Sequence, residues 1–451
     1  MNSNFYIHDT DRKALQALKA IPGFPQLLKA YMKIWNEKQF HIYNMATNLR
    51  ISDNQLSKYY NMLPPICNKL GIEIPELYLK LDVVANAYTS GDTNPVIIIT
   101  SGLLETLPDE LIPTVLAHEC GHIACHHCLY TDMAHIILSK AASLLHLGDL
   151  ALEPIRIAFA YWLRCSELSA DRAAALYDGT ADNMVKICTY FAGFDKDIDD
   201  TANIDEFINQ ALTYKKMIND SKWNRTMEFI LFQKKSHPLN AVRALECLEW
   251  SESERFKKMV SYINSNNQND DVSISAYLKE IPMPEPVNYY VGRNLCEVLC
   301  EIQKLGFKNI TTRKVTQKGL FVKQGQVVNI RIDAKDGFEM CDWYAVDSEI
   351  VIEYYEQETA DEVAAAHPNQ LRVPNSSKNY IGKQYVDVIN EFQKAGFTHI
   401  EQEEQRKSKK GLLSKNGNVA SVSVNGQTQF IKDEWFDEKS IIKIIYHTYE
   451  K

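Results

Sequence analysis

His118, Glu119 and His122 form an H-E-x-x-H sequence inside an apolar stretch that runs from Val115 to Ile123. On a helix, residues four apart lie one turn apart on the same face, so both imidazoles can bind one metal ion. Glu119 lies about 100° around the helix axis from His118, so its carboxylate can reach a water molecule instead of the metal. This arrangement indicates a zinc peptidase. The alternative is a surface helix with two unrelated histidines, which the apolar neighbours disfavour because buried histidines need polar partners.

A catalytic zinc site needs a third protein ligand and an open position for water. Glu167 and Asp171 are spaced i, i+4 in a stretch with a helical pattern of Leu and Ala residues. We expect Glu167 to be the third ligand and Asp171 to accept a hydrogen bond from the outer nitrogen of a ligating histidine. An E-x-x-x-D pattern is also typical of an exposed acidic helix face, and its pairing with H-E-x-x-H favours the ligand interpretation.

The order and spacing of these motifs resemble the HtpX-like and CAAX-prenyl-endopeptidase family of zinc metallopeptidases, which are gluzincins. The segments that carry the resemblance, between about residues 10 and 250, are His118-Glu119-Cys120-Gly121-His122, Glu167 to Arg172, Asn86-Ala87-Tyr88, Thr100 to Leu104, and Ser236-His237-Pro238 with Arg243. The resemblance implies one zinc ion per chain. It also implies that the strand through Asn86, Ala87 and Tyr88 pairs with an extended substrate. From the residues alone, these three equally fit a plain core strand.

The predicted function is zinc-dependent hydrolysis of peptide bonds in peptides or proteins. Zinc held by the three ligands would lower the pKa of a water molecule, and Glu119 would pass that water's proton to the leaving amine. His237, with Arg243 behind it, is the candidate second donor to the oxyanion. His237 fits equally well as a histidine in a turn that ends a helix. The alternative function is a non-catalytic, zinc-containing adaptor that binds partners through its C-terminal repeats, but structural zinc does not need Glu119.

The pattern predicts an α+β fold in which residues 1–264 form a mostly helical, zincin-type metallopeptidase domain. Strands at 76–79, 83–88 and 96–100 are expected to form a small antiparallel sheet over the zinc helix. Thr106 is the expected N-cap of that helix, which is predicted to run to about Tyr130. Another helix is expected at 151–178, and it carries Glu167 and Asp171.

A polar, Pro-containing stretch at 265–287 predicts a linker. Beyond it the sequence repeats, since Leu305-Gly306-Phe307 recurs 90 residues later as Ala395-Gly396-Phe397. The predicted repeats, at 288–356 and 378–451 around a linker at 357–377, each read as a helix followed by a three-stranded sheet. They resemble PASTA-like domains and hold no catalytic set of residues. We interpret them as binding or spacing modules, where a protein partner would bind.

Composition limits the remaining possibilities. The net charge of -9 argues against a nucleic-acid partner. Between Met133 and Arg164, no run reaches the length of about 18 uncharged residues that a membrane span needs. The N-terminus shows neither the basic region nor the apolar core of a signal peptide. We therefore expect a cytoplasmic protein. Of its ten cysteines, we interpret Cys120, Cys125, Cys128 and Cys165 as small core residues in a reducing compartment.

Overall fold

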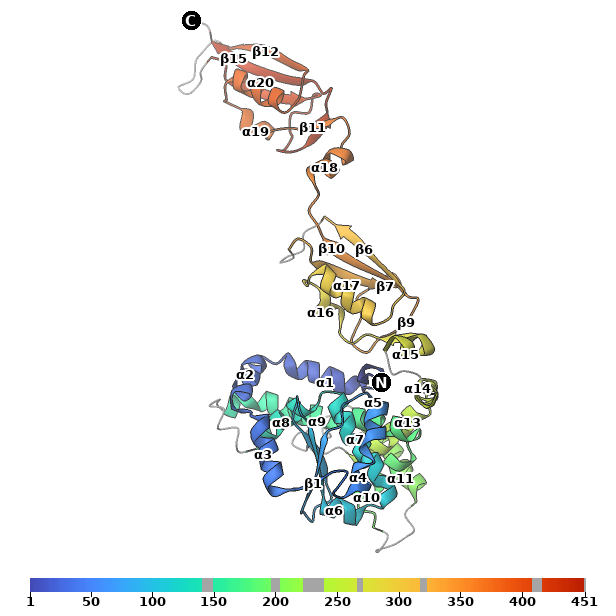
Figure 1. The fold of residues 1–451 in the computed structure, drawn as a ribbon. Helices are drawn as coiled ribbons and strands as arrows, with labels where there is room; N and C mark the ends of the chain where they lie inside the picture. The colour runs from blue at the N-terminus through green and yellow to red at the C-terminus, as the bar shows by residue number, and fades with distance from the viewer. Residues whose placement is uncertain are drawn as a thin grey trace. The chain divides into compact units, whose positions relative to one another are not determined.

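The computed structural model describes residues 1–139, 149–195, 203–221, 239–265, 271–316, 323–407 and 416–449. The chain divides into two compact units, Met1–Tyr355 and Glu356–Lys451 (Figure 1). His237 lies outside the described residues, so its predicted role stays a prediction. Helices and several small sheets share the first unit, which confirms the predicted α+β class for the peptidase part.

The first unit contains most of the helices of the described chain. They are η1 (Ser3–Phe5), α1 (Asp9–Lys19), α2 (Phe24–Ile34), α3 (Glu37–Thr47), α4 (Ser57–Tyr60), α5 (Leu63–Leu70), α6 (Ser101–Thr106), η2 (Asp109–Leu111), α7 (Ile112–Ala124), α8 (Cys128–Leu138), α9 (Asp149–Asp178), α10 (Asp182–Phe191), α11 (Ile204–Asn219), α13 (Asn240–Ser251), α14 (Glu254–Asn264), α15 (Asp271–Leu278), α16 (Val287–Tyr290) and α17 (Leu295–Lys304).

A four-stranded sheet accompanies the helices that carry the motifs. Its strands are β1 (Leu49–Ile51), β2 (Glu76–Lys80), β3 (Ala87–Ser90) and β4 (Val96–Thr100), in the order β1-β2-β4-β3. Antiparallel pairing joins β1 to β2 and β3 to β4, whereas β2 and β4 are parallel. The expectation of a purely antiparallel sheet was therefore wrong: β3 and β4 form a hairpin, and β4 adds to β2 in the same direction.

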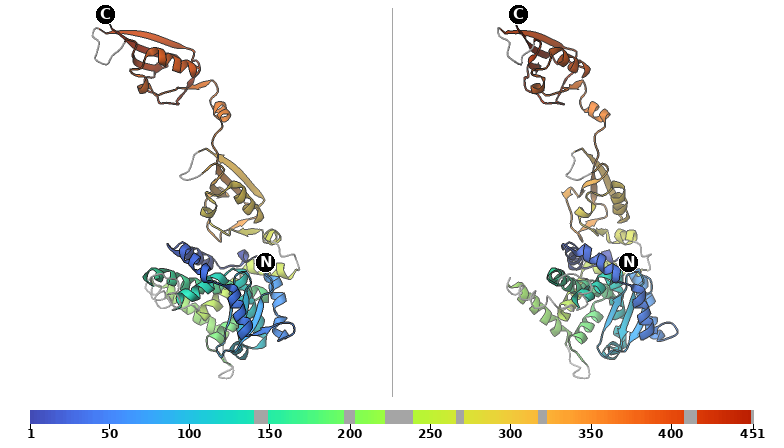
Figure 2. Two further views of the ribbon diagram at one scale, coloured as in Figure 1. Left: turned by 60° about the vertical axis from the view of Figure 1, so that its left-hand side comes forward. Right: turned by 90° about the vertical axis from the view of Figure 1, so that its left-hand side faces the viewer.

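The edge strand β3 begins at Ala87, four residues later than the predicted start at Val83. The residues before it are held by isolated backbone hydrogen bonds and by side chains instead of by strand pairing. Ser101 Oγ accepts from the backbone N–H of Asp82 at 3.1 Å, and Thr100 Oγ1 donates to the carbonyl of Val84 at 2.8 Å. β3 is an edge strand, because it pairs with β4 on one side and with no strand of this sheet on the other. Both views of Figure 2 show the blue strands beside the teal helices.

The H-E-x-x-H helix is shorter than predicted at both ends. Thr106 ends α6 and caps no helix, because the chain passes through Pro108 and a short 3-10 turn before α7 starts at Ile112. At the other end α7 stops at Ala124, and His126 takes a left-handed conformation with φ of 57° before α8 begins. The helix predicted at 151–178 is confirmed as α9.

Small residues let α7 and α9 pack very closely. A Cβ added at Gly121 would lie 2.6 Å from the Cβ of Ala173 and 3.0 Å from the Cα of Ala170. Both distances are far shorter than the contacts of about 3.5–4.0 Å that carbon atoms prefer. This close packing places the turns around His118 and His122 directly opposite the turn that carries Glu167.

The predicted linkers contain regular structure. Residues 265–287 include α15 and the strand β5 (Glu280–Pro282), which pairs with β9 (Trp343–Ala345), and Ile281 and Met283 are buried in the core of the first repeat. Apolar side chains of the predicted linker thus belong to the hydrophobic core of the first repeat instead of being exposed to solvent. The remaining strands of the first unit are β6 (Asn309–Val315), β7 (Val327–Ile332), β8 (Lys335–Asp336) and β10 (Glu349–Tyr355). They form a four-stranded sheet in the order β6-β10-β7-β8, because the short β8 extends the expected three strands.

The second unit has its own hydrophobic core and a three-stranded sheet in the order β12-β15-β13. Its elements are α18 (Ala360–Ala366), β11 (Gln370–Arg372), α19 (Ser377–Tyr380), α20 (Tyr385–Lys394), β12 (Ile400–Lys407), β13 (Val419–Val424), β14 (Trp435–Asp437) and β15 (Ile442–Tyr449). The first two fall inside the linker predicted at 357–377. The domain boundaries as a whole stay a prediction.

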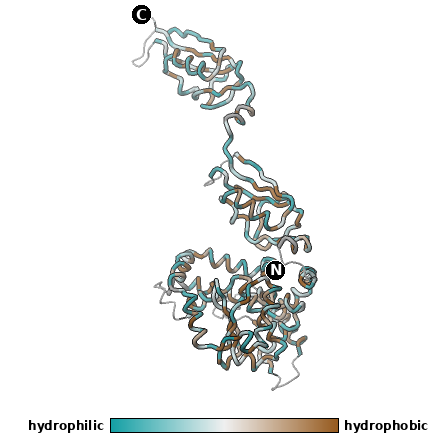
Figure 3. Tube along the Cα trace, viewed as in Figure 1, coloured by the Kyte–Doolittle hydropathy of each residue, from teal (hydrophilic) through white to brown (hydrophobic). Residues whose placement is uncertain are grey.

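In the described part of the chain, no helix combines the length and the apolar character that crossing a bilayer requires. Figure 3 shows hydrophilic and hydrophobic residues interleaved along the helices. The cellular compartment stays a prediction.

We predict that Gly121→Ala lowers the free energy of unfolding by about 1–3 kcal/mol, because the added methyl group overpacks the contact between α7 and α9. Chemical denaturation of the metal-free protein measures this change. Ala173→Gly removes the closest clashing atom, so a double-mutant cycle should show partial compensation. Strictly additive losses in the two single variants would contradict the proposed contact.

Candidate metal centre and active site

Three side chains from α7 and α9 converge on one point. The Nε2 atoms of His118 and His122 lie 3.3 Å apart, and they lie 3.4 Å and 3.6 Å from the two carboxylate oxygens of Glu167. Ligand atoms around a tetrahedral zinc ion, with bonds of about 2.0–2.2 Å, lie about 3.3–3.6 Å apart. The spacing and chemistry of this donor set therefore fit a divalent metal ion with a fourth position left for water. The structure brings together the three residues predicted as ligands.

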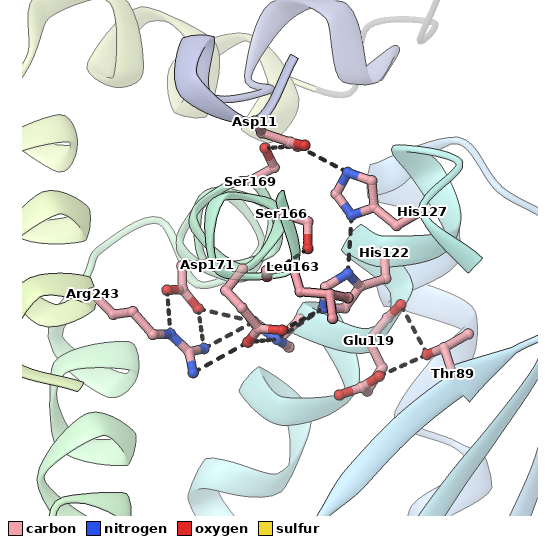
Figure 4. A network of polar contacts seen from close by, with 12 residues as sticks. Asp11, Thr89, Glu119, His122, His127, Leu163, Ser166, Ser169, Asp171 and Arg243 are labelled. Carbon is pink, nitrogen blue, oxygen red and sulfur yellow. Dashed lines mark hydrogen bonds and ion pairs between the residues drawn. The ribbon is translucent and has the colours of Figure 1, made fainter. Parts of the chain in front are cut away.

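Asp171 and Arg243 hold two of these predicted ligands, His118 and Glu167, through hydrogen bonds and ion pairs. Asp171 Oδ1 lies 2.9 Å from His118 Nδ1, which is the predicted contact. Arg243 donates two hydrogen bonds to Asp171, at 2.8 Å and 2.6 Å, and its Nη1 lies 3.3 Å from Glu167. Figure 4 shows the guanidinium of Arg243 directed at Asp171. The guanidinium of Arg243 thus orients both Glu167, the predicted third ligand, and Asp171, the partner of His118.

The charges of this cluster hold one another in their ionised forms. Burial alone would raise the pKa of Glu167 and of Asp171, but Arg243 and His118 outweigh it and hold both pKa values below their usual range. Burial alone would lower the pKa of His118, but the carboxylates of Asp171 and Glu167 raise it to about 10. In the metal-free protein at neutral pH, His118 therefore carries a proton that a metal ion has to displace.

Glu119 lines the same cavity as the three predicted ligands, and its carboxylate is held by the edge strand β3. Its Oε2 accepts a hydrogen bond of 2.7 Å from Thr89 Oγ1 on the edge strand β3, and only 5% of the residue is exposed (Figure 4). Thr89 was missed in the sequence, where a threonine in a strand carries no signal of such a contact. This hydrogen bond leaves the other carboxylate oxygen of Glu119 available for proton transfer.

A cavity of about 710 Å³ opens over these groups. The predicted substrate-strand residues Asn86, Ala87 and Tyr88 line one wall. The cavity is also lined by apolar residues that the sequence did not single out, namely Met184, Ile187 and Phe191 of α10. Residues of the edge strand and apolar side chains of α10 thus line the same cavity as the candidate metal centre.

His122 is held by a pair of residues that the sequence analysis also missed. Its Nδ1 lies 3.0 Å from His127 Nδ1, and His127 Nε2 lies 2.9 Å from Asp11 Oδ2. Both partners are almost completely buried, with exposed fractions of 0% and 1%. Asp11 is 116 residues away from His127 in sequence, so no local pattern could reveal the pair.

The chain is similar to known metallopeptidases. The model of "Peptidase family M48" matches residues 67–251. "Plastoglobule-localized metallopeptidase 48, chloroplastic" from Arabidopsis thaliana is 31% identical over 266 residues, which cover 58% of this chain and 77% of that protein. A "Protease HtpX homolog" from Sulfurovum sp. is 30% identical over 94 residues, 20% of this chain and 34% of the relative. Another from Tropheryma whipplei is 34% identical over 81 residues, 18% of this chain and 28% of the relative.

Among solved structures, the entire extracellular region of the Ser/Thr kinase PrkC from Staphylococcus aureus matches 38% of this chain and 48% of its own, at 20% identity. The TM-score of this match is 0.16, which supports no statement about shared architecture. The PASTA-like interpretation of the repeats therefore stays a prediction.

We predict that the apparent metal affinity rises about tenfold per pH unit between about pH 7 and pH 9, because His118 has to lose its proton before Nε2 can bind. Competition with a chelator whose own protonation is corrected for measures this slope. Asp171→Asn removes one of the two carboxylates that raise the pKa of His118. The pH range over which the metal affinity of this variant increases should therefore shift to lower pH. A parent affinity that does not change over this range would contradict the assignment.

Proposed function

The chain belongs to peptidase family M48, and from that premise we propose that it is a zinc-dependent endopeptidase with Glu119 as its general base. Membership in this family implies metallopeptidase activity on peptides or proteins. The observation that carries the finer proposal is the convergence of His118, His122 and Glu167 at distances that suit one tetrahedral ion. Glu119 supports it further, because a purely structural zinc site needs no buried carboxylate beside its ligands.

Zinc bound by these residues would supply a Lewis acid that polarises the attacking water and the substrate carbonyl. Glu119 accepts the proton of that water and delivers it to the leaving amine. Thr89 fixes one oxygen of Glu119 by its hydrogen bond of 2.7 Å, so the carboxylate is oriented before substrate arrives. Asp171 keeps a proton on Nδ1 of His118, which directs the lone pair of Nε2 into the site.

The substrate binds, in this proposal, as an extended segment along the free edge of β3. Asn86, Ala87 and Tyr88 line the cavity at this edge, and an edge strand offers unpaired backbone groups to another chain. Binding through the backbone suits the interior of a polypeptide, which supports an endopeptidase. His237 is proposed as the second donor to the oxyanion, next in sequence to the helix α13 that carries Arg243.

We expect Glu119→Gln to retain one zinc ion per chain and to lose about 10²–10⁴-fold in turnover, because the amide cannot accept the proton of the attacking water. Elemental analysis and a fluorogenic peptide assay with and without chelator measure the two effects. Glu110→Gln serves as the matched control, since Glu110 is an exposed acid outside the cavity. Turnover of Glu119→Gln equal to that of the parent would rule out this base.

A further inference from the structure

A line of hydrogen bonds runs from the N-terminal helix α1 to His122. Asp11 Oδ2 lies 2.9 Å from His127 Nε2, and His127 Nδ1 lies 3.0 Å from His122 Nδ1 (Figure 4). The other nitrogen of His122 faces His118 and Glu167. The first ligand, His118, is braced directly by Asp171. No carboxylate of the described residues makes the corresponding contact to Nδ1 of His122, which reaches one only through His127.

The carboxylate of Asp11 is the acceptor at the far end of this line. It accepts hydrogen bonds from Ser169 Oγ at 2.5 Å and from Trp162 Nε1 at 2.9 Å as well as from His127. Burial alone would raise the pKa of Asp11, but these partners outweigh it and hold the pKa below its usual range. Asp11 is therefore ionised and can only accept hydrogen bonds.

The geometry of this line suits a metal ion bound at Nε2 of His122. Binding through the lone pair of Nε2 leaves the ring proton of His122 on Nδ1. That Nδ1–H is placed to donate to Nδ1 of His127, and His127 can in turn donate from Nε2 to Asp11. The line thus supports the orientation and the tautomer of His122 that can bind a metal ion.

The backbone around Asp11 is fixed to the same helix that carries Glu167. Ser169 of α9, which donates to Asp11, also accepts a hydrogen bond of 2.9 Å from the backbone N–H of His8. Arg172 donates to the carbonyls of Tyr6 and Ile7 at 3.3 Å and 3.4 Å. The N-terminal segment is therefore held against α9 at Tyr6, Ile7 and His8 as well as at Asp11.

We propose that Asp11 and His127 are positioning residues for the metal ligand His122, so that the N-terminal helix α1 forms part of the metal centre. This inference rests on the proposed function, because it concerns the affinity of the same zinc site. Neither residue contacts the atoms that would bind the metal ion. Both act through the orientation and tautomer of His122.

The test compares Asp11→Asn with the parent protein and with Asp9→Asn. Asn keeps the shape of Asp11 but loses the charge that orders the line. Asp9 is an exposed acid in the same first turn of α1, so its replacement controls for a change of charge near the helix N-terminus. Zinc affinity is measured by competition with a chromophoric chelator, and the unfolding midpoint of the zinc-free protein is measured in parallel.

Asp11→Asn is expected to weaken zinc binding about 10–100-fold, as loss of such outer partners commonly does, while Asp9→Asn binds like the parent. His127→Phe keeps a ring of similar size without its nitrogens and should show the same loss. If Asp11→Asn lowers only the unfolding midpoint and leaves zinc affinity unchanged, the residue is merely structural and the inference is overturned.

A measurement on the parent protein needs no variant to fold. Nitrogen-15 NMR of the zinc-bound parent should show a proton on Nδ1 of His122 and zinc on Nε2. Zinc on Nδ1 would overturn the positioning role and leave the peptidase proposal standing. A parent that binds no zinc would instead overturn the proposed function, and this inference with it.

Discussion

Two carboxylates one turn apart on α9, Glu167 and Asp171, impose the constraint on which the site depends. Asp171 is 1% exposed and Glu167 faces the cavity, and carboxylates away from water are stable only with cationic or hydrogen-bonding partners. Arg243 supplies the cation to both, and His118 contacts both as well. Gly121 lets α7 come close enough for the histidines to reach them. Charge pairing and close packing thus define one geometry for the ligand set.

The grouping of His118, His122 and Glu167 could be predicted because the two helical motifs that carry them are local signals. His118 and His122, like Glu167 and Asp171, are related by one helical turn, and a helix of either pair presents both side chains on one face. Arg243 was found through a family resemblance, and its contacts to both carboxylates came only from the structure. The helical periodicity of α9 was strong enough to place its span within two residues of the observed start.

The parts that could not be predicted depend on contacts between distant segments. Asp11, His127 and Thr89 come from three separate segments of the chain, and their spacing in the sequence does not indicate that they contact one another or the motif residues. The parallel pairing of β2 with β4 depends on which strand of the β3–β4 hairpin lies next to β2, and the strand patterns leave that choice open. Apolar residues in the predicted linkers, such as Ile281, looked like spacer residues because surrounding prolines dominated the pattern.

The N-terminal segment contacts more than the metal centre within the first unit. Phe5 packs edge-on against Trp343 of the first repeat with ring centroids 6.2 Å apart, and Arg12 donates to the carbonyl of Pro284 at 3.4 Å.

X-ray absorption spectroscopy at the zinc edge tests the central claim most directly. It should show only nitrogen and oxygen ligands at about 2.0–2.2 Å, with two imidazoles among them. Sulfur ligands at about 2.3 Å would assign the zinc to the cysteines and contradict the account.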